Sequence, residues 1–317
     1  MAKQDKIEHL VSVVVPLYNG EKTIKITIDS ILNQTYFGFE VLVVDDGSTD
    51  GSAAIVKGFD DSRIRYFLQK NSGSPAAPRN LALKEAKGEL IALCDQDDVW
   101  YPQKLEVQLA DYEAIQNKND IGVVISSADL IDGEGKVINT NPTPFSGFAT
   151  AETFTRALYG GNFITTCSAI IPKKVLDTVG DFDLKQVGVD DYDLWFRIAE
   201  HYGILAVHET LCAWRYREDS LSASKARIYM ETEKVFLKLE AKSVSPEMQA
   251  GHGKNLGRIF VAGLLERDPS AINYFEENFT QYPISAKVMM LYRLQQLSPE
   301  AARSIVRMMK VFGLVSL

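Results

Sequence analysis

Three carboxylates lie within four residues at the end of an apolar run, and their spacing suggests a chemical function. Asp95, Asp97 and Asp98 directly follow the apolar residues 90–94. At a protein surface, charges this close repel each other by roughly 1 to 4 kcal/mol per pair. A hard divalent cation, Mg²⁺ or Mn²⁺, removes this repulsion, and one or two carboxylates together with substrate phosphate oxygens can hold it. The alternative is a solvated acidic loop in which Asp98 caps a helix that begins at Pro102.

A second acidic cluster could supply a general base to the same site. Asp190, Asp191 and Asp193 lie at the start of a helix expected over residues 190–203. Carboxylates in a first helical turn interact favourably with the helix dipole, so the cluster alone indicates little about function. Beside a site for a metal and a diphosphate, however, such a carboxylate could deprotonate an acceptor hydroxyl.

The segment after the first expected strand is 16-PLYNG-20. It lacks the G-x-G-x-x-G pattern of a dinucleotide-binding turn, which argues against a nicotinamide or flavin cofactor. Tyr18 could line a flat base, and Asn19 could cap the next helix. Pro16, Asn19 and Gly20 are also typical residues of a simple turn.

Two further segments offer groups that could bind a nucleotide. Asp45 and Asp46 follow the second expected strand. One carboxylate is enough for a turn, so the other could accept a hydrogen bond from a nucleobase N–H. Arg79 lies in the first turn of a helix expected over residues 76–87. A cation there opposes the helix dipole, which favours an anionic or base partner for this side chain.

The elements that must position these residues follow the pattern of an α/β fold. Short β-branched runs alternate with amphipathic segments, which predicts a mainly parallel sheet flanked by helices on both faces. Ligands of such sheets bind beyond the carboxyl ends of the strands, where the acidic residues lie. Strands are expected over residues 11–15, 41–44, 64–67, 90–94, 123–125 and 166–171, and helices over residues 22–32, 52–59, 76–87 and 102–117.

The chain changes character near residue 222. We expect two regions, residues 1–222 containing the sheet and residues 223–317 forming an α-helical C-terminal region. The last segment, residues 301–317, is basic and apolar. It could lie on an anionic membrane, or pack against the rest of the protein or another subunit. Five helices are expected here, over residues 225–243, 247–266, 269–280, 284–297 and 299–312.

Composition excludes several classes of protein. The 317-residue chain has a net charge of -8, which disfavours nucleic-acid binding because phosphate contacts need a basic surface. Three scattered cysteines form neither a disulfide framework nor a zinc-binding spacing, which favours the reducing cytoplasm. The polar N-terminal residues lack the apolar core of a signal peptide, and no apolar run of about 18 residues predicts a membrane span.

Together these segments resemble family 2 of the nucleotide-sugar glycosyltransferases, which have a GT-A type fold with a Rossmann-like nucleotide-sugar-binding sheet. The resemblance covers about residues 9–222 and rests on the order and spacing of its pieces. These are VSVVVPLYN at 11–19, SILNQT at 30–35, VVDDGSTD at 43–50, Arg79-Asn80, Asp95-x-Asp97-Asp98 and Asp190-Asp191.

The resemblance implies a role for each of these positions. Asp191 would be the base that deprotonates the acceptor, and Asp95 and Asp97 would form a D-x-D site for Mn²⁺ or Mg²⁺. The expected nucleotide-binding residues are Pro16, Tyr18, Asn19, Asp46, Arg79 and Asp95. The residues expected to contact the diphosphate or the acceptor are Asp190, Trp195 and Arg217.

Two positions depart from the family pattern. The family more often has Glu-Asp where this chain has Asp190-Asp191, which keeps the second acid. It also often has a histidine where the segment 214-WRYREDSLS-222 has Arg217. An arginine cannot ligate a metal, although it can bind a diphosphate through two hydrogen bonds.

The expected activity is that of an inverting glycosyltransferase, a hexosyltransferase of cell-surface polysaccharide synthesis. It would move a sugar from a nucleotide diphosphate donor, a UDP-sugar, to a hydroxyl of a saccharide or lipid-linked acceptor. We expect it in the cytoplasm or on the inner face of the membrane, with membrane contact or self-association through the C-terminal helices. The alternatives are a metal-dependent nucleotidyltransferase and a non-catalytic nucleotide-sugar-binding scaffold.

Overall fold

The computed structural model of the chain describes residues 9–217, 220 and 223–311, which divide into two compact units. Residues 1–155 and 163–217 belong to the first unit, and residues 156–162 and 218–317 to the second. The boundary predicted at residue 222 lies outside the described residues. So do the first eight residues and residues 312–317 of the predicted C-terminal segment.

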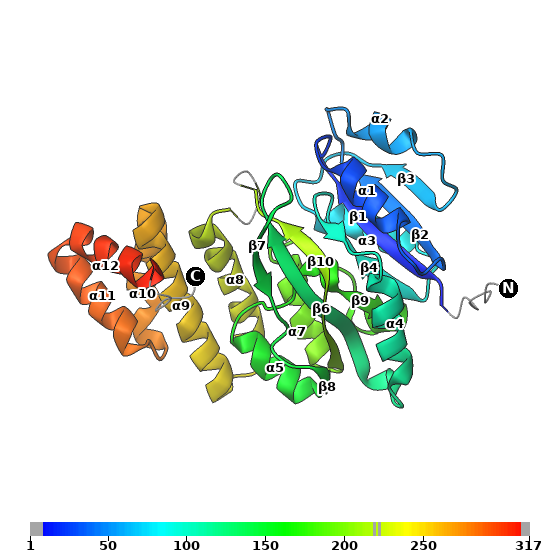
Figure 1. Cartoon of the computed structure of the whole chain (residues 1–317). Helices are drawn as coiled ribbons and strands as arrows, with labels where there is room; N and C mark the ends of the chain where they lie inside the picture. The colour runs from blue at the N-terminus through cyan, green and yellow to red at the C-terminus, as the bar shows by residue number, and fades with distance from the viewer. Residues whose placement is uncertain (1–8, 218–219, 221–222, 312–317) are drawn as a thin grey trace. The chain divides into compact units, whose positions relative to one another are not determined.

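Within the described residues, the first unit is built around a ten-stranded sheet with the order β3-β2-β1-β4-β9-β6-β10-β5; β7 pairs with β6, and β8 with β10 (Figure 1). The strands β3, β2, β1 and β4 are parallel, as are β6 and β10, and β9 joins the two sets in antiparallel orientation. The predicted α/β fold with a mostly parallel sheet is therefore confirmed. The strands are β1 (Val11–Leu17), β2 (Phe39–Asp45), β3 (Ile64–Leu68), β4 (Leu90–Leu93), β5 (Val99–Trp100), β6 (Ile121–Ile131), β7 (Val137–Asn141), β8 (Gly147–Ala149), β9 (Ile170–Pro172) and β10 (Gly203–Arg215).

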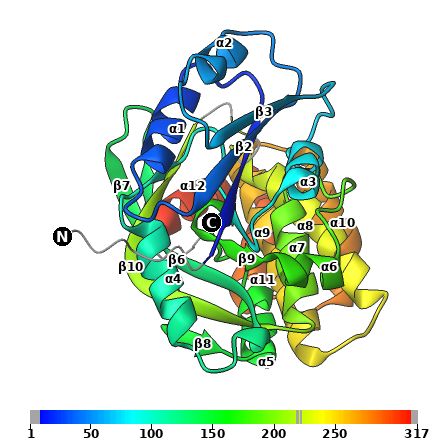
Figure 2. The same ribbon diagram turned by 90° about the vertical axis from the view of Figure 1, so that its right-hand side faces the viewer.

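Helices cover both faces of this sheet. Figure 2 shows α1 and α4 on one side and α3, α6 and α7 on the other. Strand residues alternate between the two faces, so Val11, Val13 and Val15 of β1 join the same apolar core as Ile24 and Ile28 of α1. The helices of this part of the chain are α1 (Ile24–Leu32), α2 (Ser52–Lys57), α3 (Ala76–Glu85), α4 (Lys104–Ala114), α5 (Ala151–Tyr159), α6 (Lys173–Val179) and α7 (Asp190–Ala199).

The second unit is helical, as predicted. Its helices are α8 (Lys225–Glu240), α9 (Pro246–Glu266), α10 (Pro269–Asn278), α11 (Ala286–Leu297) and α12 (Pro299–Val311). Four of them begin at a residue whose side chain accepts a hydrogen bond from a backbone N–H of the first turn, which satisfies donors at the helix start. These N-cap residues are Ser224, Ser245, Asp268 and Ser285.

None of the described helices is both long enough and apolar enough to cross a membrane. Cys94, Cys167 and Cys212 are all buried and free.

Candidate active site

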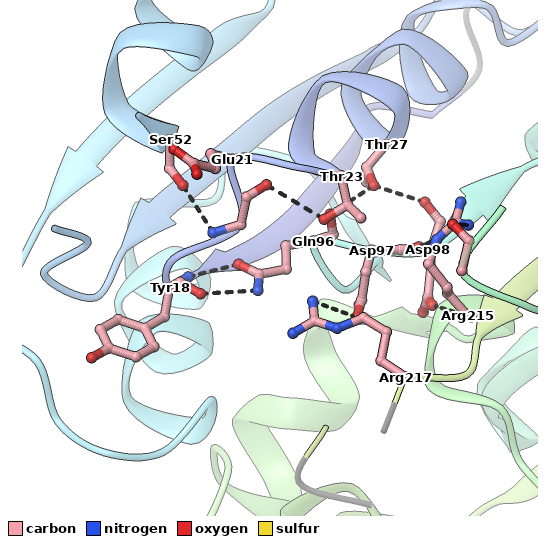
Figure 3. A network of polar contacts seen from close by, with 12 residues as sticks. Tyr18, Glu21, Thr23, Thr27, Ser52, Gln96, Asp97, Asp98, Arg215 and Arg217 are labelled. Atoms are coloured by element: carbon pink, nitrogen blue, oxygen red, sulfur yellow. Dashed lines mark hydrogen bonds and ion pairs between the residues drawn. The ribbon is translucent and has the colours of Figure 1, made fainter. Parts of the chain in front are cut away.

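The loop that contains Asp95, Asp97 and Asp98 follows β4 and is fastened to the end of β1. The side-chain amide of Gln96 accepts a hydrogen bond from the Tyr18 backbone N–H (2.7 Å) and donates one to the Tyr18 carbonyl (3.0 Å) (Figure 3). The carboxyl ends of two neighbouring parallel strands therefore meet here, as expected for a ligand site in an α/β sheet.

Asp98 is a structural acceptor, which corrects the expectation that it caps a helix. It is 1% exposed, and its Oδ1 accepts a hydrogen bond from the Arg215 backbone N–H at 3.1 Å. Helix α4 begins two residues after Pro102, and its N-cap, Gln103, makes no side-chain cap. Burial, with the charges of Asp97 and Asp95, raises the pKa of Asp98 well above its usual range. The carboxyl group is thus held in the interior and away from solvent.

Arg215 and Thr27 hold the backbone of the aspartate loop (Figure 3). The Arg215 Nε donates to the Asp97 carbonyl (2.9 Å), and its Nη1 donates to carbonyls in the turn after β6, Asp132 and Gly133. The Thr27 hydroxyl lies 2.8 and 2.9 Å from the carbonyls of Gln96 and Asp98. Both side chains are almost fully buried. The loop is therefore fixed from two sides before any ligand binds.

A single arginine joins the aspartate loop to the second acidic cluster. Arg79 Nη2 lies 2.6 Å from Asp95 Oδ1, and Arg79 Nη1 lies 2.6 Å from Asp190 Oδ2. The guanidinium is buried and stacks against the Phe182 ring at 5.3 Å. Burial disfavours its charge, but Asp95 and Asp190 outweigh burial and raise the pKa of Arg79. Arg79 therefore has the anionic partners that its position predicted, and both of them are protein carboxylates.

Asp191 lies next to this ion pair at the start of α7. Its Oδ2 accepts a hydrogen bond from the Thr166 hydroxyl (2.8 Å) and its Oδ1 accepts one from the Tyr192 backbone N–H (2.7 Å). Burial raises the pKa of Asp191, and the negative charge of Asp95 raises it further. A carboxylate with a raised pKa holds a proton more tightly, which suits proton abstraction at neutral pH.

Asp45 and Asp46 accept hydrogen bonds from different parts of the first unit, and the nucleobase contact expected of Asp46 stays a prediction. Asp45 is buried and accepts hydrogen bonds from the Ser48 N–H and the Tyr66 hydroxyl, both at 2.7 Å, which fixes the turn. Asp46 accepts from Gln69 Nε2 (2.6 Å) and from the N–H and hydroxyl of Ser72. Both of its oxygens are thus engaged, so contact with a nucleobase requires Gln69 or Ser72 to release a bond.

The residues at the end of β1 differ in exposure. Pro16 is buried within the strand, whereas Tyr18 is 47% exposed, and its ring points away from the aspartates in Figure 3. Asn19 does not cap the next helix, because a turn separates it from α1, whose N-cap is Thr23. It adopts a left-handed backbone conformation (φ 48°), and its Oδ1 accepts a hydrogen bond from Thr49 N–H at 2.8 Å.

The carboxylate of Asp97 lies beside the guanidinium of Arg217, which follows it by 120 residues in the sequence. Arg217 Nη1 lies 3.3 Å from Asp97 Oδ2. Burial and the neighbouring charge of Asp95 raise the pKa of Asp97 to about 6, although Arg217 opposes this rise. The ionised form of Asp97 is therefore under-compensated, and an added cation would stabilise it.

Asp95 and Asp97 offer a divalent ion only part of a ligand shell. Among the residues that the structure describes, no group of three or more His, Cys, Asp or Glu side chains is arranged to hold a metal. Two partly exposed carboxylates nevertheless match the way Mg²⁺ is usually held, with water and substrate phosphates completing the shell. The residues fit a metal that arrives with a phosphate ligand, and they do not form a closed protein cage.

Trp195 lies in the core of the first unit. Its side chain is fully buried, and the indole N–H has no hydrogen-bond partner within the described part of the chain. A fully buried ring does not face a substrate in this structure, and the contact expected of Trp195 with the diphosphate or the acceptor stays a prediction.

Gln96, Thr27 and Arg215 organise the loop, and sequence reasoning did not single them out. Gln96 lies between two of the loop's aspartates, so its place in the D-x-D spacing was the available signal. The partners of Thr27 and Arg215 lie about 70 and 118 residues away, and no local pattern reports such contacts.

The sequence of the chain is similar to those of known glycosyltransferases. A match to the family described as glycosyl transferase family 2 spans residues 12–180. The chain is 32% identical over 220 residues to the UDP-Glc:alpha-D-GlcNAc-diphosphoundecaprenol beta-1,3-glucosyltransferase WfgD of Escherichia coli, covering 69% of this chain and 81% of that protein. It is 37% identical over 202 residues to an uncharacterized glycosyltransferase of Rickettsia bellii, covering 62% of this chain but only 29% of that longer protein.

Solved structures share the fold. The crystal structure of S. aureus TarS 1-349 in complex with UDP-GlcNAc matches with a TM-score of 0.67 and 20% sequence identity. The match covers 96% of this chain and 92% of that chain.

Proposed function

The chain belongs to glycosyl transferase family 2 and is therefore a glycosyltransferase, and on this basis we propose that it transfers a sugar, with inversion, from a UDP-sugar to an acceptor hydroxyl. We propose a saccharide on a lipid carrier as the acceptor, at the cytoplasmic face of the membrane during cell-surface polysaccharide synthesis. The relative WfgD, whose name specifies a UDP-Glc donor and a diphosphoundecaprenol-linked acceptor, supports this choice.

The ion-paired Arg79 is the observation that carries the proposal. It contacts Asp95 of the D-x-D loop and Asp190 beside the proposed base, each at 2.6 Å. One rigid, buried guanidinium thus sets the spacing between the donor diphosphate and the group that activates the acceptor. Fixed spacing of this kind lowers the barrier by holding the reacting groups in a productive arrangement.

Asp191 is the proposed general base. Thr166 and the Tyr192 N–H orient its carboxylate, and burial raises its pKa. The acceptor oxygen gives its proton to Asp191 and forms a bond to the anomeric carbon, while the bond from that carbon to the diphosphate oxygen breaks. The attack comes from the face opposite the leaving UDP, so the anomeric centre inverts.

Asp95 and Asp97 are the residues that would hold Mn²⁺ or Mg²⁺. When bound, such an ion would neutralise the negative charge that develops on the departing diphosphate. Arg217, next to Asp97, is placed to donate hydrogen bonds to the same diphosphate, since a guanidinium matches phosphate oxygens well. Asp46 and the exposed Tyr18 are proposed to receive the uracil and its ribose.

All of these residues belong to the first unit. We therefore assign catalysis to the predicted domain of residues 1–222 and no chemical step to residues 223–317.

Replacement of the proposed base tests the mechanism. Asp191→Asn preserves shape and the hydrogen bond from Thr166, but it removes the proton acceptor. We expect UDP affinity, measured by calorimetry with Mn²⁺, to change less than about twofold while turnover falls by about 10²- to 10⁴-fold. Asp193→Asn, on the same helix but paired with Arg197 instead, is the control. Near wild-type turnover in Asp191→Asn would show that the base is another group.

The released product separates the proposal from its two alternatives. A glycosyltransferase frees UDP, whereas a nucleotidyltransferase attacks phosphorus and frees pyrophosphate. A scaffold that only binds the nucleotide sugar frees neither, even with Mn²⁺ and acceptor saccharides present.

A further inference from the structure

Helices α11 and α12 each present a face that is both apolar and basic. On α11, Met290, Arg293 and Leu297 are spaced three and four residues apart, so they share one side of the helix, and all three are exposed. Leu297 is 85% exposed and Met290 55%. On α12, Arg307 and the 54%-exposed Met308 are consecutive residues, about 100° apart around the helix, and both are exposed to solvent. Helices α11 and α12 follow each other in the chain and contact each other. Large apolar side chains that are this exposed indicate a surface that binds an apolar partner.

The charge of this segment is opposite to that of the rest of the protein. From residue 284 to the end, the chain has five basic residues and one acidic residue, a net charge of +4 in a protein of net charge -8. The single acid, Glu300, is paired with Arg303 at 3.1 Å. On α10, Glu276 accepts a hydrogen bond from Gln296, so one carboxylate borders the basic face. The basic residues are Lys287, Arg293, Arg303, Arg307 and Lys310.

We propose that the exposed faces of α11 and α12 dock the enzyme on an anionic phospholipid surface. Basic side chains are attracted to the lipid headgroups, and Met290, Leu297 and Met308 enter the boundary with the acyl chains. The inference deepens the proposed function and rests on it for its purpose, because a lipid-carried acceptor lies at such a surface.

Two other partners fit this surface less well. A symmetric dimer through these faces would bring the same basic patch of two copies together, and like charges would repel. A nucleic acid would be attracted by the arginines but would meet exposed Leu297 and Met290, and the remaining chain carries a net charge of -12.

Vesicle flotation with the full-length protein tests the proposal. We expect binding to vesicles made of equal parts phosphatidylglycerol and phosphatidylcholine, and little binding to phosphatidylcholine alone. Salt at about 1 M, where the Debye length is about 3 Å, should release the protein. Arg293→Gln with Arg307→Gln should weaken binding by about 30-fold, since each basic residue near an anionic surface contributes a factor of about five. Leu297→Gln should weaken binding as well.

Matched controls come from the same helical unit. Arg267→Gln removes an exposed arginine at the end of α9, and Val244→Gln removes an apolar side chain that is 60% exposed. Neither should change vesicle binding by more than about twofold. The proposal is overturned if anionic vesicles do not bind the protein, or if the control variants lose binding equally. It is also overturned if Leu297→Gln leaves vesicle binding intact but converts a dimer to a monomer.

Hydrolysis of UDP-sugar in solution is measured in parallel and needs no membrane. If the wild-type protein hydrolyses UDP-sugar normally but does not bind anionic vesicles, the docking surface alone is overturned. Vesicle binding by a protein that hydrolyses no UDP-sugar and binds no UDP would instead count against the proposed function.

Discussion

Asp97 and Asp98 are adjacent carboxylates whose surroundings assign them different tasks. Asp97 is partly exposed and faces Arg217, whereas Asp98 is buried and accepts the Arg215 backbone N–H. Two neighbouring acids of one motif are therefore distinguished by what surrounds them. In the sequence, the crowding of like charges marked both residues, and only Asp97 belongs to the D-x-D spacing with Asp95.

Substitution of the two neighbours by asparagine should separate these tasks. Asp97→Asn weakens the carboxylate set, so UDP affinity in Mn²⁺ should fall by at least about tenfold. Asp98→Asn keeps an oxygen that accepts the Arg215 N–H and replaces a buried carboxyl group whose raised pKa disfavours its charge, so affinity should stay within about twofold and stability should not fall. Calorimetric titration with UDP and thermal unfolding measure the two effects. Equal losses of affinity would assign Asp98 to the ligand site too.

Arg215 should matter for stability as well as for binding. Arg215→Met keeps the apolar stem but leaves the carbonyls of Asp97, Asp132 and Gly133 without their donor. We expect the free energy of unfolding, measured in urea, to fall by about 2 to 4 kcal/mol, with weaker UDP binding. Arg63→Met, which breaks a more exposed ion pair with Asp61, should cost less than about 1 kcal/mol. A loss no larger than this control would contradict the role given to Arg215.

At the scale of elements, the sequence predicted most of the parallel half of the sheet and missed most of the other half. Apolar runs such as 41–44 lie in strands buried on both faces, so their composition is unambiguous. Strand β10 has the exposed His208 and Glu209 in its middle, and its register with β6 shifts on both sides of Thr210. Those polar residues interrupt the apolar pattern, and the irregular pairing allows them, so the pattern did not predict a strand there.

For the site, too, local sequence identified several residues, whereas their partners depend on contacts between distant segments. The strand-end acids and Arg79 were identifiable because each breaks a local rule, either like-charge crowding or a cation in a first helical turn. The partner of each group depends on how distant elements pack. The predicted cap roles of Asn19 and Asp98 were wrong because tertiary hydrogen bonds engage both side chains.

A histidine of α9 lies between two carboxylates of α8, which predicts that the stability of the helical unit depends on pH. His252 is fully buried; its ring contacts Glu233 and Glu240, stacks on Phe236 and lies against the tilted ring of Tyr282. Burial lowers the pKa of His252, but the hydrogen bonds and charges of the two glutamates outweigh it and raise the pKa above the usual value. The stabilisation is therefore complete below the pKa of an unfolded histidine and is lost as pH rises through the folded pKa.

We expect the helical unit to lose about 1 to 3 kcal/mol of unfolding free energy as pH rises from about 6 to about 9. Hydrogen exchange in α8 and α9, corrected for its intrinsic dependence on pH, measures this loss. His252→Gln should flatten the dependence, whereas His201→Gln at an exposed position should leave it unchanged. Greater protection at high pH than at low pH would show the sign to be wrong.

At the scale of the whole molecule, an acidic protein is proposed to bind an acidic donor. The net charge of -8 repels a nucleoside diphosphate, so local cations must offset it. Arg217 and a metal at Asp97 and Asp95 are the proposed ones. Binding should therefore depend strongly on the metal.

A thermal-unfolding series tests this dependence. UDP with Mn²⁺, at about 100 times its dissociation constant, should stabilise the folded protein by about 2.7 kcal/mol, and UDP with a chelator should stabilise it much less. GDP and dTDP at the same concentration should give smaller shifts. Equal shifts from all three nucleotides, or from UDP with and without metal, would contradict the donor and metal assignments respectively.

The hydrogen bond from Arg215 to the Asp97 carbonyl bears on when the site forms during translation. The two partners are 118 residues apart along the chain, and β10 is the last strand of the sheet to leave the ribosome. Contacts of such long range form late, because the intervening chain must first be ordered. A nascent chain that has already made β1 and β4 therefore has the acids of the site but not their final geometry. We expect the enzyme to become active only when residue 215 has docked, so that translation itself times the appearance of transferase activity.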